Sequence, residues 1–167
     1  MIRAPFPWFG GKSRAADLIW SRLGDVANYI EPFAGSLAVL LARSTEPRIE
    51  TVNDLDAMVA NFWRATATHP DLVAHHADWP VSEPDLHARH RWLVAQLPAL
   101  RRKLVQDPDY CDPRVAGWWV WGISQWIGSG WCQSTTPAMK LPLIGGGGKA
   151  VARGEGGHSA GRGVHAS

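Results

Sequence analysis

The stretch YIEPFAGS, residues 29–36, decides the fold that the sequence predicts. Two apolar residues lead into Pro32, which has no backbone N–H for a ladder hydrogen bond and therefore ends a strand. Gly35 then frees the backbone for a tight turn. Ser36 is a suitable N-cap for a short apolar helix over residues 37–43. A strand, a turn and a helix in this order are the first half of a nucleotide-binding βαβ unit.

A second strand is predicted over residues 49–53, and it ends next to the carboxylate of Asp54. From Gly35 to Asp54 is 19 residues, close to the roughly 20 residues between a glycine turn and a ribose-binding acid. Together with a first strand over residues 28–32, this gives two parallel strands. A two-stranded parallel sheet leaves both edges open and is not a stable core. We therefore expect further strands from elsewhere, or a chain that is a piece of something longer.

Helices are predicted for most of the remaining sequence. Ser13 can cap a helix that Gly24 ends, and Asp56 can cap a helix over residues 57–67. Residues 70–84 are predicted to be a connection that can contain a short helix. Three more helices are expected after it. The first covers residues 85–97 with Asp85 as the cap, the second is a basic helix at 100–105 after a break at Pro98, and the third covers residues 113–127 with Pro113 in the first turn.

These elements predict three parts of the chain. Residues 1–67 form an α/β half-domain, and residues 70–132 form a helical region of separate character. Residues 133–167 are rich in glycine and too poor in apolar side chains to offset the entropy of ordering, so they are expected to be a disordered tail.

Composition narrows the class of protein. The 17 Lys and Arg against 15 Asp and Glu give a net charge of +2, so a polyanion would have to meet a local basic patch. Cys111 and Cys132 are too few for a disulfide framework or a metal cluster, which favours a reduced, cytoplasmic protein with structural cysteines. No apolar run approaches the roughly 18 residues of a membrane span. No metal site and no membrane partner are expected.

Three motifs carry a resemblance to a known family: WFGGK at residues 8–12, YIEPFAG at 29–35 and ND at 53–54. In this order they resemble the N-terminal half of DNA adenine-N6 methyltransferases of the Dam (D12) class, over roughly residues 5–67. The resemblance implies an α/β fold with a partial Rossmann-like methyltransferase core, followed by an α-helical DNA-recognition region at residues 70–132. It also implies a bacterial or phage-encoded enzyme.

The reaction that the resemblance implies is transfer of a methyl group from S-adenosylmethionine to the N6 amine of an adenine flipped out of double-stranded DNA. By position, the cofactor-binding residues would be Trp8, Lys12, Glu31, Phe33, Gly35 and Asp54. Their chemistry suits these roles: Asp54 can accept hydrogen bonds from ribose hydroxyls, Lys12 can neutralise a carboxylate, and Trp8 offers a flat face to adenine or a sulfonium.

Two features depart from the family pattern. Leu37 stands near the position of a second glycine, where its side chain would crowd the cofactor. The catalytic D-P-P-Y motif is missing, and residues 107–110, DPDY, only look like it. Asp107 and Tyr110 follow a basic helical segment rather than a buried strand, so we interpret them as a lookalike. The expectation is a truncated methyltransferase with weak or no activity alone, whose partner is a missing C-terminal segment of the same enzyme.

Alternatives stay open at this stage. The competing function is a non-catalytic DNA-binding or interaction module with a methyltransferase-like shell. Asp54 could be a turn residue, Trp8 a core aromatic, and Glu31 a residue that only caps or pairs locally. Trp119, Trp126, Ile123 and Ile127 are predicted on one buried helical face, with Trp118, Trp121 and Trp131 left over. The basic residues Arg89, Arg91, Arg101, Arg102 and Lys103 either face phosphate or form a solvated face.

Overall fold

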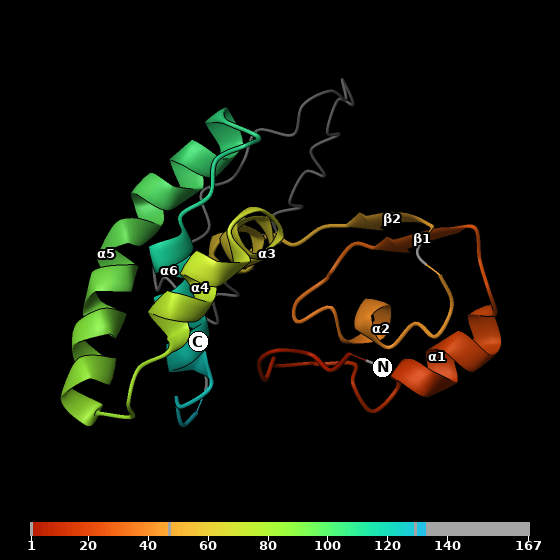
Figure 1. The fold of residues 1–167 in the computed structure, drawn as a ribbon, viewed down its shortest axis with the longest axis horizontal. Helices are drawn as coiled ribbons and strands as arrows, with labels where there is room; N and C mark the ends of the chain where they lie inside the picture. Colours follow the sequence, from red (N-terminus) through yellow and green to blue (C-terminus); the bar gives the residue numbers. More distant parts are fainter. Residues whose placement is uncertain (1, 47, 129, 133–167) are drawn as a thin grey trace, which may run out of the picture. The chain divides into compact units, whose positions relative to one another are not determined.

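The computed structural model describes residues 2–46, 48–128 and 130–132 (Figure 1). The elements follow in the order α1 (Ala16–Leu23), β1 (Asn28–Glu31), α2 (Ala38–Leu41), β2 (Ile49–Val52), α3 (Ala57–Thr68), α4 (Pro70–Ala77), α5 (Glu83–Gln106) and α6 (Pro113–Ile123). All the described residues fall within one compact unit, Met1–Thr135. The division at residues 67–70 stays a prediction, and the predicted tail at 133–167 lies outside the described residues.

The two predicted strands are present and pair in parallel, with Asn28 opposite Ile49 and Glu31 opposite Val52. β1 ends directly before Pro32, as predicted. Within the described part of the chain the sheet has two strands. The mixed helix and strand class is therefore confirmed, whereas a Rossmann-like core stays a prediction.

One face of β1 is covered and its other face is open, whereas all four residues of β2 are exposed. Tyr29 of β1 is buried in a cluster with Ala16 of α1, Val39 of α2 and Ala42, and Figure 1 draws α1 and α2 below the strands. Side chains alternate between the two faces of a strand. Ile30 of β1 accordingly points the other way and is 63% exposed, and Ile49 of β2 is 67% exposed.

The larger core lies among the helices α3 to α6. Buried apolar side chains of α3, α5 and α6 meet there, and the N-terminal arm adds Phe6. Trp119 of α6 is 1% exposed, and its ring centroid lies 4.9 Å from that of Phe6 and 5.8 Å from that of Phe62. The arm is therefore anchored to the helices by an aromatic cluster.

The helix α5 corrects the predicted break at Pro98. It runs without interruption for 24 residues and contains Pro98 inside it, and its N-cap is Ser82 rather than Asp85. A proline in a helix costs one backbone hydrogen bond. A buried stripe at helical spacing on this helix compensates for that loss, formed by Leu93, Leu97, Leu100 and Leu104.

The short N-terminal helices also differ from prediction at their starts. The N-cap of α1 is Ala15, and Ser13 makes no cap, although Gly24 ends the helix as predicted. The N-cap of α2 is Leu37 rather than Ser36, and this helix has four residues in place of the predicted seven. Leu37 adopts a left-handed conformation, with φ 53° and ψ 29°. Because this conformation costs a non-glycine residue about 1–2 kcal/mol, the turn is strained there.

Aspartate side chains cap the helices α3 and α6. The side chain of Asp56 accepts hydrogen bonds from the backbone N–H of Met58 and Val59, as predicted. Asp112 caps α6 by accepting from Val115. The short helix that the connection at residues 70–84 could contain is present as α4. No helix in the part of the chain that the structure describes has the length and the apolar character that crossing a bilayer requires.

Candidate functional site

The turn after β1 is tied to the end of β2. The backbone N–H of Ala34 donates to the carbonyl of Asn53 at 2.9 Å. Gly35 has φ 51°, in the left-handed region that favours glycine. The chain therefore reverses tightly between β1 and α2, next to the point where β2 ends.

Asp54 joins the turn to this strand end. Its Oδ2 accepts a hydrogen bond from the N–H of Gly35 at 2.7 Å, and its Oδ1 accepts one from the N–H of Asp56 at 2.9 Å. The second contact is the turn role that was the alternative for this residue. The first contact spans 19 residues and brings the predicted acid to the predicted glycine turn. Because Asp54 is half-buried, its carboxylate is still partly open to solvent.

Trp8 lies against the same turn. A Cβ atom added to Gly35 would lie 2.5 Å from Cδ1 of the Trp8 indole, so a residue with a side chain would clash at this position. The carbonyl of Gly35 accepts a hydrogen bond from Nε1 of Trp63 at 2.8 Å. The Trp8 ring also lies 6.1 Å from that of Trp119, centroid to centroid. Trp8 is thus both an anchor to the core and a wall of the turn.

Lys12 bridges the turn and β1. Its Nζ donates to the carbonyl of Phe33 at 2.8 Å and lies 3.0 Å from Oε1 of Glu31. That oxygen is buried and has no hydrogen bond, so its contact with Lys12 is an ion pair without hydrogen-bond geometry. The charge of Lys12 is therefore already balanced by Glu31, which the sequence-based role for Lys12 did not include.

Glu31 is held in place from its other side. The hydroxyl of Tyr29 donates to its Oε2 at 2.9 Å, and Glu31 is 4% exposed. Burial and this neighbouring carboxylate raise the pKa of the Tyr29 hydroxyl well above its ordinary value. The alternative of local pairing thus describes the hydrogen bond from Tyr29, whereas the ion pair of Glu31 with Lys12 spans 19 residues.

The structure brings most of the predicted site residues together. Their contacts form two sets: Gly35 contacts both Trp8 and Asp54, and Lys12 contacts both Glu31 and the carbonyl of Phe33. Phe33 contributes its carbonyl, while its side chain is 80% exposed. The cavity of about 590 Å³ in the helical region and a smaller one beside His87 and His90 are both lined by other residues. We call the six residues the turn site.

The lookalike at residues 107–110 lies at the end of α5. Asp107 is the C-cap of this helix, and its Oδ1 accepts from the N–H of Asp109 at 2.9 Å. Nη1 of Arg64 lies within hydrogen-bonding distance of the carbonyls of Asp107 and Tyr110. The preceding segment is helical, as predicted, and this tetrapeptide forms the turn that follows a helix.

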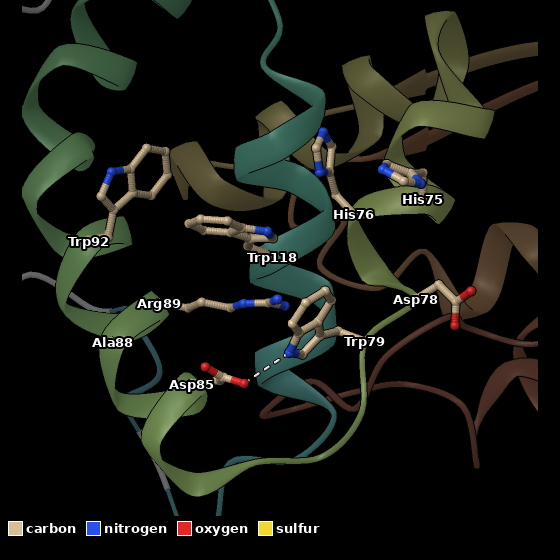
Figure 2. A pocket seen from close by; sticks show the side chains of 9 residues that line it. All are labelled: His75, His76, Asp78, Trp79, Asp85, Ala88, Arg89, Trp92 and Trp118. Carbon is tan, nitrogen blue, oxygen red and sulfur yellow. Dashed lines mark hydrogen bonds between the residues drawn. The ribbon is translucent and has the colours of Figure 1, made fainter.

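A second group of polar and aromatic side chains lines a cavity in the helical region (Figure 2). The cavity has a volume of about 590 Å³ and is lined by side chains from α4, α5, α6 and the connection after α4. Arg89 of α5 reaches into it and is 8% exposed. The sequence left two interpretations open for the basic region that includes Arg89, and burial of this side chain rules out the solvated face for Arg89.

The position of Arg89 relative to the leucines of α5 could have indicated that its side chain is buried. It lies four residues before Leu93 and eight before Leu97, on the buried face of the helix. Its positive charge argued for the surface, where arginine usually lies. We call the group of Arg89 with Trp79, Trp92, Trp118 and Trp121 the arginine–indole cluster.

The tryptophan-rich segment also differs in part from prediction. Trp119 is buried as predicted, but Ile127 is 98% exposed and lies beyond the end of α6. Trp121 and Trp131, which the predicted helical face left over, are 5% and 7% exposed. The helix ends at Ile123, so the periodicity beyond it does not describe a face.

The titratable residues outside these groups suggest no further site. Within the described ranges no group of three or more His, Cys, Asp or Glu side chains could hold a metal ion. Cys132 is buried, which raises the pKa of its thiol to about 12 and makes it a poor nucleophile. Sγ of Cys111 lies 3.3 Å from the hydroxyl of Thr68.

Comparison with known proteins gives one match. Residues 8–83 match the family model of the D12 class N6 adenine-specific DNA methyltransferases. The match contains the whole turn site and ends at the start of α5, and it confirms the resemblance that the motifs predicted. Searches of curated proteins and of solved structures gave no match.

Proposed function

We propose that the turn site of this D12-class segment binds S-adenosylmethionine, and that the protein acts in methyl transfer to the N6 amine of adenine in double-stranded DNA. One observation carries the proposal: the hydrogen bond from Gly35 to Asp54 joins the glycine turn and the acid at the end of β2 in a single site. In nucleotide-binding α/β units these two features hold a ribose and the group next to it.

The donors and acceptors of the turn site fit this cofactor. Each carboxylate oxygen can accept two hydrogen bonds, and each oxygen of Asp54 accepts one from the backbone. One acceptor position per oxygen is left for the two ribose hydroxyls. Oε1 of Glu31 accepts no hydrogen bond but lies 3.0 Å from Nζ of Lys12, so it would receive the ammonium group of the methionine part only if that group shared or replaced the contact with Lys12. The exposed ring of Phe33 offers a face for adenine.

The task of these residues is positional. S-adenosylmethionine supplies a methyl group that is already activated on a positively charged sulfur. The chain has to hold the cofactor and keep it oriented. Gly35 lets the backbone come close, and Asp54 fixes the turn through its bond to Gly35. The ion pair of Lys12 and Glu31 holds the strand end beneath the turn.

We propose in addition that the sheet is completed by a further segment of the same enzyme, which supplies the catalytic motif. Parallel sheets are normally covered on both faces. Here Ile30 and Ile49 leave one face apolar and exposed. Duplex DNA would be bound by the helical region that follows β2, where the family resemblance locates recognition.

Calorimetry on the full chain tests the proposal. S-adenosylmethionine and its demethylated product should both bind, and Asp54→Ala should weaken binding by at least about tenfold, or roughly 1.4 kcal/mol, because the ribose loses its acceptors. Asp109→Ala, which removes an exposed carboxylate after α5, is the control and should leave affinity unchanged. Circular dichroism confirms that each variant is folded. A folded wild-type chain that gives no heat with either ligand refutes the proposal.

A transfer assay then tests the chemistry. Tritiated S-adenosylmethionine and adenine-containing duplex DNA are incubated with the chain alone and with a polypeptide that carries an apolar strand ending in D-P-P-Y. Label should enter DNA in the mixture at a much higher rate than with the chain alone. Equal rates would contradict the proposed role of a further segment and leave cofactor binding untouched.

A further inference from the structure

The guanidinium of Arg89 is buried without a hydrogen bond to any of the described residues. Three indole faces surround it, with distances of 4.8, 5.0 and 4.3 Å from its Cζ to the ring centroids of Trp79, Trp118 and Trp121. Its Nη1 is closed off from solvent and has no partner. Indole rings attract the positive charge, but their faces are poor substitutes for oxygen acceptors.

The nearest acid does not serve as a partner. Asp85 lies one turn before Arg89 on α5, and its Oδ2 accepts a hydrogen bond from Nε1 of Trp79 at 2.9 Å. Asp78 is exposed, and in Figure 2 its carboxylate is directed away from Arg89. Burial lowers the pKa of the Arg89 guanidinium, which Asp85 opposes only in part. Arginine nevertheless stays charged in proteins, so the site holds a cation that has a buried donor, Nη1, without an acceptor.

The cavity beside Arg89 is large enough for a small ligand. Its volume of about 590 Å³ is within the range of pockets that enclose small molecules. Its walls include the indoles of Trp92 and Trp118, and Figure 2 shows Arg89 extending between Trp118 and Trp79. Arg114 lies 4.2 Å from the Trp118 ring centroid and adds a second positive charge nearby.

We propose that this cavity binds the phosphate group of a nucleotide, with Arg89 as its hydrogen-bond donor and with Trp92 and Trp118 as the surface for the base. The planar fork of arginine matches phosphate oxygens, and aromatic faces stack bases of any sequence. Nη1 reaches a ligand when a surrounding indole shifts, and Trp79 is the one exposed to 52%. The choice of a nucleotide among phosphate compounds rests on the proposed function, whereas the acceptor-free arginine does not.

Tryptophan fluorescence of the full chain provides the test, because the indoles lie at the cavity. The probes are deoxyadenosine monophosphate, deoxyadenosine and inorganic phosphate. The monophosphate should quench saturably and bind at least about tenfold more tightly than deoxyadenosine, and inorganic phosphate should compete with it. Equal affinity for the monophosphate and deoxyadenosine would overturn the proposal, since the phosphate would then not be recognised.

Variants of α5 locate the site. Arg89→Met should weaken binding of the monophosphate by at least about tenfold, and Arg89→Lys, which keeps the charge but loses the fork, by about fivefold. Arg91→Met removes an exposed guanidinium two residues along the same helix, outside this cavity, and should stay within about twofold. The lysine variant serves where the methionine variant does not fold. Wild-type affinity in both Arg89 variants, or an equal loss in Arg91→Met, would refute the assignment.

Two further titrations are needed. The first distinguishes a DNA strand from a free nucleotide as the source of the phosphate, and the second tests whether the turn site binds its cofactor independently of this cavity. A single-stranded oligonucleotide that binds more tightly than the monophosphate, and that depends on Arg89, identifies a DNA strand as the source. The reverse order identifies a free nucleotide. S-adenosylmethionine affinity should be unchanged in Arg89→Lys. If the chain binds the monophosphate through Arg89 but does not bind S-adenosylmethionine, the proposed function is refuted and the phosphate site in this cavity is supported.

Discussion

The strand pair and the four helices that follow it differ in how completely they bury their apolar side chains. All four residues of β2 are exposed, and Ile30 of β1 faces solvent. The helices α3, α5 and α6 instead share a core whose central residues, Met58, Leu93 and Trp119, are 1% exposed or less. Stability of the described chain is therefore expected to reside in the helices, and the sheet offers surface for contacts with other groups.

The N-terminal arm contacts both the helical core and the turn after β1, so the two regions are not independent of each other. Phe6 is buried in the helical core, and Trp8, two residues later, walls the turn at Gly35. Trp63 of α3 donates to the carbonyl of Gly35. The turn site thus owes part of its order to the helices, although its residues precede them in the sequence. Substitutions in either region measure how far this dependence goes.

The largest effect is expected at the centre of the helical core. Trp119→Ala removes a 1% exposed indole and should lower the free energy of unfolding by about 3–5 kcal/mol. Ile30→Ala, on the open face of β1, should change it by less than about 0.5 kcal/mol. Urea denaturation followed by circular dichroism measures both. Equal losses would show that the strand pair is as well packed as the helices, and the comparison would fail.

Local signals made the strand pair and several helix ends predictable. Pro32 ends β1, Gly35 makes the turn and Asp56 caps α3, because each acts on backbone within two or three residues of itself. The order of these signals also carried the family resemblance. The strand pair and these helix ends are therefore determined by residues close to them in the sequence.

Long-range packing accounts for what the sequence did not predict. Pro98 does not break α5, because the leucines on either side of it are held in one core. Lys12 is paired with Glu31, 19 residues away, which no local pattern indicates. A solvated face was one of the two interpretations for Arg89, but the indoles that enclose it come from α6 and from the connection after α4. Tertiary context decided these cases.

An effect of intermediate size on stability is expected from alanine substitutions at two glycines, one against the helical core and one away from it. Gly35 and Gly10 both have positive φ, at 51° and 71°. A Cβ at Gly35 would meet the Trp8 indole, whereas nothing lies within 4 Å of one at Gly10. Both alanine variants should lose about 1–2 kcal/mol to backbone strain, and Gly35→Ala a further ~1–3 kcal/mol to overpacking.

The readout for this pair is thermal unfolding together with calorimetry of S-adenosylmethionine. Gly35→Ala should also lose cofactor affinity, since the Trp8 wall has to move, while Gly10→Ala should keep it. If the two variants lose the same stability, Trp8 does not press on the turn, and the proposed link between the helical core and the turn site is wrong.

The smallest effect is expected at the ion pairs that lead into β2. Asp25 accepts hydrogen bonds from the hydroxyl of Thr45 and from Nη2 of both Arg43 and Arg48, and these contacts hold the pKa of its carboxyl below the usual value near 3.8. The folded pKa is thus lower than the unfolded one. The stabilisation is present above the unfolded pKa and is lost as pH falls through the folded pKa.

Asp25→Asn should therefore lower the midpoint of thermal unfolding slightly at pH 7, and the difference from wild type should shrink as the pH falls below the ordinary pKa of about 3.8. It should also shrink in about 1 M salt, because these charges are partly exposed. Asp109→Asn, at an exposed position after α5, should show neither dependence. A difference that persists unchanged at low pH would mean that Asp25 acts through packing rather than charge, and that the strand pair is held more like the helices than its exposure indicates.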